Sequence, residues 1–211
     1  MKIINHLIWL GHAAFQISLN KIIYIDPYEL EDDLPKADYI FITHEHFDHF
    51  SPEDIKKIQK DSTLIIATKQ CKGKIDGKFK YVEIGEEFSL DEINIEVVAA
   101  YNIDKFREPG LPYHPKEEEK VGYIINIDGE KIYHAGDTDF IPEMKSIKNI
   151  DIALLPVSGK YTMTPEEAAK ATDMIQPKIA IPMHYGGIVG TVDDAKKFQE
   201  LSSIKVLILS K

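Results

Sequence analysis

Four side chains that commonly bind metal ions lie within six consecutive residues of this sequence: His44, His46, Asp48 and His49. They follow residues 37–43, a run of β-branched and aromatic residues that predicts a buried strand. Because side chains alternate along an extended chain, His44 and His46 should point the same way, while Asp48 and His49 lie in the following turn. The spacing predicts that one strand end serves two cations. The alternative is a polar turn that is merely rich in histidine.

Three further candidate ligands, His114, Asp137 and His184, follow predicted strands or lie in loops. Asp137 comes just after a predicted strand at residues 131–134, where a single carboxylate can bridge two cations. His184 ends the apolar run at residues 178–183 and is followed by two glycines. Two cations about 3.5–4 Å apart can bind a nucleophilic oxygen and polarise a substrate together, which is hydrolase chemistry.

Other residues are placed to support such a site. His12 lies between two predicted strands, where it either faces the site or is an ordinary turn histidine. Asp26 ends a strand next to the metal-binding strand and could orient a ligand by hydrogen bonding. His134 is expected to support the site or pack in the core rather than bind metal. Tyr161 and Tyr185 either contact substrate or pack at the rim.

Composition limits the partners. The 25 Lys and Arg residues stand against 35 Asp and Glu residues, a net charge of −10. Nucleic-acid binding depends on basic side chains that neutralise phosphates, so no nucleic-acid partner is expected. Cys71 is the only cysteine, which excludes an internal disulfide and favours a reducing cytoplasm. No apolar run approaches about 18 residues, so no membrane partner is expected. A homo-oligomer is compatible with the sequence.

The 211 residues are predicted to form one domain, 1–211, in which strands and helices alternate. A βαβ unit is expected from strand 37–43 through helix 52–60 to strand 63–67. Asp128-Gly129 predicts a type I′ hairpin turn. Further elements are expected as strands within 2–25, 81–84, 87–90, 93–100, 121–127, 131–134, 151–156, 178–183 and 204–209, and as helices at 165–175 and 191–201. Residues 101–120 lack any periodicity, which is typical of a functional loop such as a lid.

The run H-x-H-x-D-H at residues 44–49, with His114, Asp137 and His184 after it, resembles the signature of the metallo-β-lactamase-fold superfamily. The segments GHAAF at 11–15, HAGDT at 134–138 and MHYG at 183–186 look like its small branch of ascorbate-6-phosphate lactonase-like and uncharacterised hydrolases. The resemblance implies an α/β fold: a four-layer αββα sandwich of two mixed β-sheets with helices outside. Asp26 matches the acidic residue that the family carries after an early strand.

The resemblance also implies a ligand set. One cation would be bound by His44, His46 and His114. The other would be bound by Asp48, His49 and His184, with Asp137 bridging the two. Many members carry the third histidine in a short proline-glycine-histidine turn, whereas here Pro109-Gly110 precedes His114 by several residues. Zinc suits this imidazole-rich set, and manganese or iron would fit the same ligands.

The expected function is that of a dinuclear metal-dependent hydrolase. A metal-bound hydroxide would attack a carbonyl or phosphoryl centre of a small molecule, either a lactone or a phosphorylated metabolite. Asp48 and Asp137 would orient the nucleophile and move its proton, and His12 would contact the substrate. One alternative is a nuclease or phosphodiesterase acting on nucleic acid, which the acidic composition disfavours. Another is a di-iron redox protein, although relatives of that kind have a carboxylate where His46 stands here. A non-catalytic binding domain is the fourth possibility.

Overall fold

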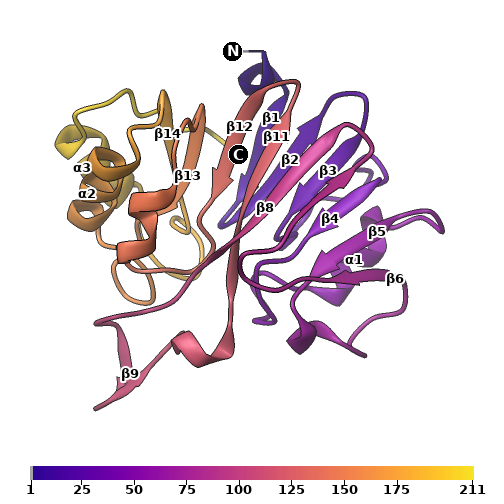
Figure 1. The fold of residues 1–211 in the computed structure, drawn as a ribbon, viewed down its shortest axis with the longest axis horizontal. Coiled ribbons are helices and arrows are strands. Elements are labelled where there is room, and N and C mark those ends of the chain that lie inside the picture. Colours follow the sequence, from indigo (N-terminus) through magenta and orange to yellow (C-terminus); the bar gives the residue numbers. More distant parts are fainter. Residues whose placement is uncertain (1) are drawn as a thin grey trace. The chain divides into compact units, whose positions relative to one another are not determined.

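Residues 2–83, with 210 and 211, build the first of two units in this computed structural model, which describes residues 2–211. This N-terminal unit contains one mixed six-stranded sheet in the order β1-β2-β3-β4-β5-β6 (Figure 1). Strands β1 to β3 pair antiparallel, and β3 to β6 pair parallel. Its elements are β1 Leu7–Gly11, β2 Ala14–Ser18, β3 Ile22–Ile25, β4 Tyr39–Phe41, β5 Leu64–Ala67, β6 Lys78–Tyr81, α1 Pro52–Ile58 and the 3₁₀ turns Ile3–His6 and Lys69–Cys71.

The predicted βαβ unit is confirmed, because α1 connects the parallel strands β4 and β5. Ser51 caps the helix by accepting a hydrogen bond from the Asp54 backbone N–H, and Pro52 occupies the first turn. Ile55 and Ile58 are fully buried in the same apolar cluster as Ile40 of β4. This packing supports β4, and the 44–49 motif follows shortly after the end of that strand.

The first strand expected within residues 2–25, from Ile3 to Leu10, is observed from Leu7 onward, and only its start is wrong. Residues Ile3–His6 form a 3₁₀ turn, and strand pairing starts only where Leu7 meets Ile17 of β2. Because β2 ends one residue later at Ser18, residues 3–6 have no strand opposite them to complete a ladder.

Cys71 is expected to be inert towards thiol reagents in the folded protein. Its side chain is fully buried, and burial raises the pKa of the thiol to about 12, although a contact with the Thr68 hydroxyl acts in the opposite direction. Almost no thiolate therefore exists at pH 8. Titration with a chromogenic disulfide at that pH should detect no thiol in the native protein and one per chain in urea. Rapid labelling of the native protein would contradict this burial.

The C-terminal unit, residues 84–209, contains a second mixed six-stranded sheet in the order β14-β13-β12-β11-β8-β7 (Figure 1). Strands β7, β8, β11 and β12 pair antiparallel, whereas β12, β13 and β14 pair parallel. Its elements are β7 Glu87–Leu90, β8 Ile93–Ala99, β9 Phe106–Glu108, β10 Leu111–Pro112, β11 Val121–Ile127, β12 Glu130–His134, β13 Ile152–Pro156, β14 Ile179–Met183, α2 Pro165–Ile175, α3 Val192–Leu201 and the 3₁₀ turns Lys116–Glu118 and Pro142–Ser146.

Local sequence signals explain the connections of this unit. Asp128 and Gly129 both have positive φ, at 53° and 82°, so the predicted type I′ turn between β11 and β12 is confirmed. The predicted helices at 165–175 and 191–201 are confirmed as α2 and α3, and Thr164 and Thr191 each form a capping box at their starts. The two helices lie side by side. No helix within residues 2–211 combines the length and apolar character needed to cross a membrane.

The segment 101–120, predicted to be irregular, contains a short hairpin of β9 and β10 that projects from the C-terminal unit (Figure 1). Pro109 and Gly110 form its turn, and the φ of Gly110 is +78°, a value that glycine adopts without strain. Ile103, Phe106 and Leu111 are exposed on this segment. Strands of two or three residues are too short to show an alternating pattern in the sequence, so the hairpin could not be predicted from it.

The predicted closing strand at 204–209 is reduced to one bridge between Ala180 of β14 and Val206. Ala180 donates to the Lys205 carbonyl, and Leu207 donates to the Ala180 carbonyl. The next residue of β14 on that edge is Pro182, which has no N–H to continue the ladder. Pro182 therefore limits the pairing of the chain end with β14.

Candidate metal centre

Each unit carries part of the predicted ligand set. In the N-terminal unit, the buried carboxylate of Asp26 organises the motif. It accepts hydrogen bonds from the Thr43 backbone N–H at 2.8 Å and the Thr43 hydroxyl at 2.7 Å. It also lies 2.8 Å from Nδ1 of His49. Because an ionised carboxylate only accepts hydrogen bonds, His49 carries its proton on Nδ1, and its Nε2 has the lone pair that binds metals.

His44 is oriented in the same way through Thr43. The single hydroxyl proton of Thr43 is donated to Asp26, so its oxygen accepts from Nδ1–H of His44 at 3.0 Å. The lone pair of His44 is therefore also on Nε2. Its ring centroid lies 4.1 Å from that of His49 and 4.6 Å from that of His46. The strand end thus gathers three imidazoles, and two of them have a defined tautomer.

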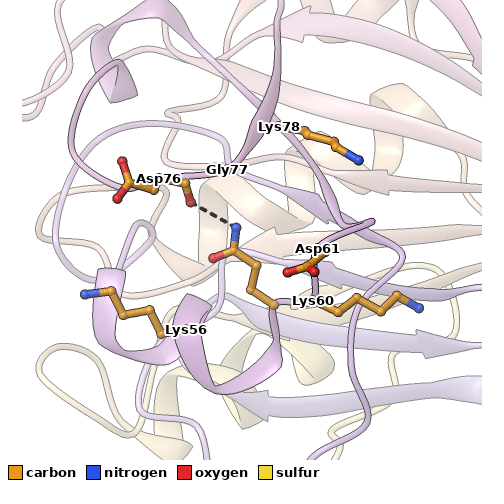
Figure 2. Close-up of a pocket in the computed structure, with 7 residues that line it drawn as sticks. Lys56, Lys60, Asp61, Asp76, Gly77 and Lys78 are labelled. Atoms are coloured by element: carbon orange, nitrogen blue, oxygen red, sulfur yellow. Dashed lines mark hydrogen bonds between the residues drawn. The ribbon is translucent and has the colours of Figure 1, made fainter.

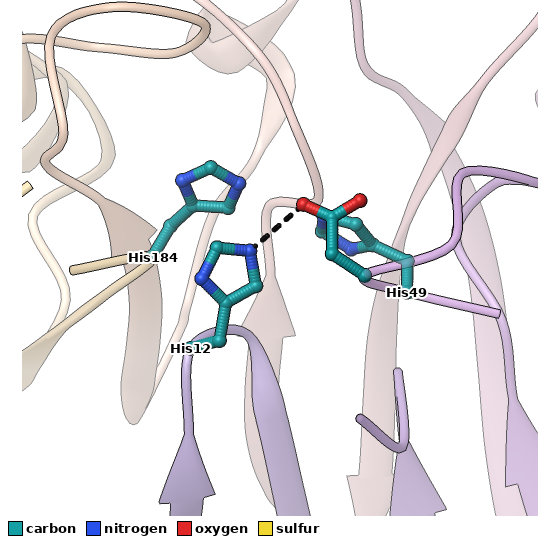
Figure 3. Close-up of side chains that lie close together, drawn as sticks. His12, His49 and His184 are labelled. Carbon is teal, nitrogen blue, oxygen red and sulfur yellow. Dashed lines mark hydrogen bonds and ion pairs between the residues drawn. The ribbon is translucent and has the colours of Figure 1, made fainter. Parts of the chain in front are cut away.

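His12 faces the motif from the turn between β1 and β2. Its Nε2 lies 3.0 Å from Oδ2 of Asp48, shown by the dashed line in Figure 3. The ligand atoms of His12, Asp48 and His49 all lie within 4.8 Å of one another. His12 has φ +50° and Asp26 has φ +46°, unusual values for residues other than glycine. Backbone strain of this kind clusters at functional sites.

In the C-terminal unit, Asp137 follows β12. Two imidazoles, which come from two other segments, lie near one of its carboxylate oxygens. Its Oδ2 lies 3.4 Å from Nε2 of His114 and 3.2 Å from Nε2 of His184. His184 directly follows β14, with φ +60°. Its Nδ1 lies 3.1 Å from the Ser158 hydroxyl. The three predicted ligands of this unit are therefore together, and all are buried.

Two residues that the sequence did not suggest hold His114 in place within the C-terminal unit. Asn102 accepts hydrogen bonds from both the backbone N–H and Nδ1 of His114, each at 2.9 Å. Asp139, two residues after Asp137, accepts from the side chain of Asn102 at 3.0 Å. Burial raises the pKa of the Asp139 carboxyl, while the hydrogen bonds it accepts and the nearby Lys105 act to lower it. The D-x-D spacing of Asp137 and Asp139 was the available signal in the sequence.

His134, Tyr161 and Tyr185 lie outside the groups of candidate metal-binding atoms in the described part of the chain. His134 is fully buried, and its Nδ1 accepts a hydrogen bond from the Gly136 backbone N–H at 3.2 Å. Tyr185 is buried, and burial raises its pKa. Tyr161 packs edge-on against Tyr113, with ring centroids 4.6 Å apart. None of the three belongs to a group of candidate metal-binding atoms within residues 2–211.

An aromatic pair lies next to His12. The ring centroids of Tyr28 and His12 are 5.8 Å apart, as are those of Tyr28 and Phe47. Phe47 lies inside the motif itself, yet 66% of its surface is exposed. Phe47 is thus a large apolar side chain exposed between candidate metal ligands.

A surface hollow in the N-terminal unit is separate from these residues. It has a volume of about 520 Å³ and is lined by Lys56, Gln59, Lys60, Asp61, Asp76, Gly77 and Lys78 (Figure 2). The side chain of Gln59 crosses it to donate to the Asp76 carbonyl at 3.0 Å, and Lys60 is paired with Asp38. No residue of the 44–49 motif lines the hollow.

The donor chemistry of both units fits divalent transition metals. Imidazole nitrogens with the proton held on Nδ1, together with buried carboxylates, are ligands for zinc and similar cations. The partners of Nδ1 are Asp26, Thr43, Asn102 and Ser158, which is the hydrogen bonding that metal-binding histidines usually have. Each unit therefore presents a pre-oriented set of ligands.

Comparison with known proteins identifies the family. The family model described as a beta-lactamase superfamily domain matches residues 6–184. A UPF0173 metal-dependent hydrolase of Pyrococcus furiosus is 35% identical, over 95% of this chain and 94% of that protein. The crystal structure of a Parabacteroides distasonis protein that bears the provisional name of metal-dependent hydrolase has a TM-score of 0.85 and 40% identity, covering 96% of this chain and 91% of that one.

A second solved structure, the metallo hydrolase Igni18 of Ignicoccus hospitalis, has a TM-score of 0.75 and 26% identity, over 97% of this chain and 94% of that one. These similarities extend over both sheets and all the segments that carry candidate ligands. The predicted family and fold are confirmed, and with them the hydrolase assignment. The chain belongs to the β-lactamase superfamily, has the metallo-β-lactamase fold and is a metal-dependent hydrolase.

Proposed function

We propose that this chain is a dinuclear hydrolase of small molecules in which the ligands of the two units together bind two divalent cations. His44, His46 and His114 would bind one cation. Asp48, His49 and His184 would bind the other, and Asp137 would bridge them. Zinc is the first choice for this imidazole-rich set, and manganese or iron fits it as well.

The observation that carries the proposal is the position of Asp137. One of its oxygens lies within 3.4 Å of His114 Nε2 and 3.2 Å of His184 Nε2. In the proposed assignment these two histidines belong to different cations. A carboxylate placed between the ligands of two cations is the arrangement that a bridging ligand needs. The fixed tautomers of His44 and His49 support the assignment from the other unit.

Two cations bound here would lower the pKa of a coordinated water and polarise a carbonyl or phosphoryl oxygen of the substrate. Asp48 and Asp137 would orient the nucleophile and take up its proton. His12 holds Asp48 by a hydrogen bond from Nε2 and would contact the substrate beside it. This hydrogen bond limits the rotation of the Asp48 carboxylate, so the side chain would lose less conformational entropy on reaching the transition state.

The substrate class is inferred from the charge of the chain and from the exposed aromatic pair. A net charge of −10 opposes the approach of a long polyanion such as RNA or DNA. Phe47 and Tyr28 offer an apolar surface beside His12. A lactone or a phosphorylated metabolite with an apolar portion fits this environment. The protein would act in the cytoplasm.

A substrate screen tests this function. Metal-depleted protein, reconstituted separately with zinc, manganese or iron, would be assayed on lactones, phosphomonoesters, phosphodiesters, thioesters and single-stranded nucleic acid. We expect hydrolysis in at least one small-molecule class that chelation abolishes and metal restores. His46→Ala should lower the rate at least about 100-fold, more than most outer-sphere changes do. Cleavage confined to nucleic acid, with a steep salt dependence, would contradict the proposal.

The matched control is His6→Ala. His6 is an exposed histidine of the same unit, in the 3₁₀ turn Ile3–His6, and it belongs to no group of candidate metal-binding atoms within residues 2–211. This variant should retain the metal content and activity of the parent protein. Equal losses in both variants would show that the effect of His46→Ala is not due to ligation.

A further inference from the structure

The side chain of Asn102, in the loop after β8, makes four hydrogen bonds and is almost completely buried. Its Oδ1 accepts from the backbone N–H and from Nδ1 of His114, both at 2.9 Å. Its Nδ2 donates to Oδ1 of Asp139 at 3.0 Å and to the Tyr161 carbonyl at 2.8 Å. Both ends of the amide are therefore occupied.

The orientation of this amide is determined by backbone groups. The oxygen and nitrogen of an asparagine side chain look alike, so partners of fixed chemistry must distinguish them. The backbone N–H of His114 can only donate, and the Tyr161 carbonyl can only accept. Oδ1 must therefore face His114 and Nδ2 must face Tyr161. The carboxylate of Asp139 adds a second acceptor on the Nδ2 side.

This orientation defines the tautomer of His114. Oδ1 of Asn102 is only an acceptor, so Nδ1 of His114, at 2.9 Å, must carry a proton. The lone pair of the neutral ring is then on Nε2, the atom that lies 3.4 Å from Asp137 Oδ2. The opposite tautomer would put a lone pair against Oδ1 and a proton on the nitrogen that faces Asp137.

Asp139 holds three consecutive residues of the same loop. Besides Asn102, its carboxylate accepts hydrogen bonds from the backbone N–H groups of Ile103 at 2.6 Å and Asp104 at 3.0 Å. Its own N–H donates to the Tyr101 carbonyl at 2.9 Å. Asp139 is buried and lies two residues after Asp137. The segment 137–139 thus carries the candidate ligand Asp137, and through Asp139 it also anchors the loop that contains Asn102, the hydrogen-bond partner of His114.

We propose that Asn102 and Asp139 are positioning residues, which hold His114 as the Nδ1–H tautomer and so present its Nε2 for metal binding. The last step rests on the proposed function, in which His114 is a ligand. The tautomer itself depends only on hydrogen bonds within the C-terminal unit and can be measured without metal.

The test compares Asn102→Ala with Asn102→Asp. The alanine variant removes the oxygen that faces His114, whereas the aspartate variant keeps an oxygen there and loses the donor towards Tyr161. Proteins with ¹⁵N-labelled histidine would be examined by long-range ¹H–¹⁵N correlation spectra. The His114 signal among the eight histidines would be assigned from its loss in His114→Gln. Affinity for zinc would be measured by chelator competition.

We expect the Nδ1–H tautomer in the parent protein and in Asn102→Asp, and a mixture or the Nε2–H tautomer in Asn102→Ala. Zinc affinity should fall about 10–100-fold in Asn102→Ala, the range typical of outer-sphere partners of metal ligands. Asp139→Asn replaces one acceptor oxygen by an NH₂ group, which would face N–H donors of residues 102–104 and could not accept from them. We expect this variant to weaken zinc binding as well. Asp151→Asn serves as the control, because Asp151 is a buried carboxylate of the same unit that binds Lys131 and Lys178 instead.

An Nε2–H tautomer in the parent protein, or an unchanged tautomer in Asn102→Ala, would overturn the proposal. A tautomer change with unaltered zinc affinity would also overturn it, since His114 would then not be positioned for a metal. A protein that binds no zinc, but whose tautomer changes as expected, would contradict the proposed function and support the hold of Asn102 on the ring.

Discussion

Replacing Asp137 with asparagine should remove bound metal and hydrolytic activity together. One Asp137 oxygen lies 3.4 Å from Nε2 of His114 and 3.2 Å from Nε2 of His184, so this carboxylate lies beside two of the proposed ligands. The amide has nearly the same shape, but it lacks the negative charge and one of the two ligand oxygens. Zinc affinity should fall by more than about 100-fold, beyond the range of outer-sphere changes, and the rate of hydrolysis should fall with it. Elemental analysis and chelator competition measure the affinity.

Asp151→Asn is again the matched control for this substitution. It neutralises a buried carboxylate of the same unit that accepts from the Lys131 backbone N–H at 2.7 Å and pairs with Lys178 at 2.6 Å. Any loss of metal through general destabilisation would appear in both variants. If Asp137→Asn retained the metal content of the parent protein, the bridging assignment would be wrong.

Removing the carboxylate of Asp26 should both destabilise the fold and weaken metal binding. Asp26 is fully buried and accepts from the Thr43 N–H, the Thr43 hydroxyl and His49 Nδ1. A buried donor without a partner costs about 1–3 kcal/mol, so Asp26→Ala should lower the free energy of unfolding by roughly 3 kcal/mol or more. His44 and His49 would also lose their defined tautomers. Urea unfolding measures the first effect and chelator competition the second.

Asp54→Ala separates these two effects. Asp54 is a buried carboxylate of the same unit that accepts from the backbone N–H groups of Glu29 at 2.9 Å and Leu30 at 3.0 Å. This variant should lose stability by a comparable mechanism while it keeps the tautomers of the motif histidines. Similar metal affinities in Asp26→Ala and Asp54→Ala would mean that Asp26 has no part in orienting ligands.

The sequence predicted those candidate ligands that lie close together along the chain. His44, His46, Asp48 and His49 follow one strand, so the local pattern of that strand was enough to bring them together. Asn102 and Asp139 are 37 residues apart, and their contact depends on the folding of a whole loop. Only the resemblance to a family, rather than periodicity, predicted that the four segments with ligands act together.

His114 shows how a hairpin can separate a candidate ligand from the turn expected before it. Pro109-Gly110 suggested a displaced version of the usual proline-glycine-histidine turn, but it forms the turn of the β9–β10 hairpin instead. The base of this segment is closed where the Asn102 N–H donates to the His114 carbonyl at 2.9 Å. The hairpin therefore lies between two residues that are joined at its base, and His114 lies beside Asn102.

Anomalous diffraction from crystals of zinc-loaded protein tests the central claim most directly. We predict two zinc peaks about 3.5–4 Å apart. The first should be bound by His44, His46 and His114 and the second by Asp48, His49 and His184, with Asp137 contacting both. A single peak, or peaks bound by other residues at saturating zinc, would contradict the dinuclear account.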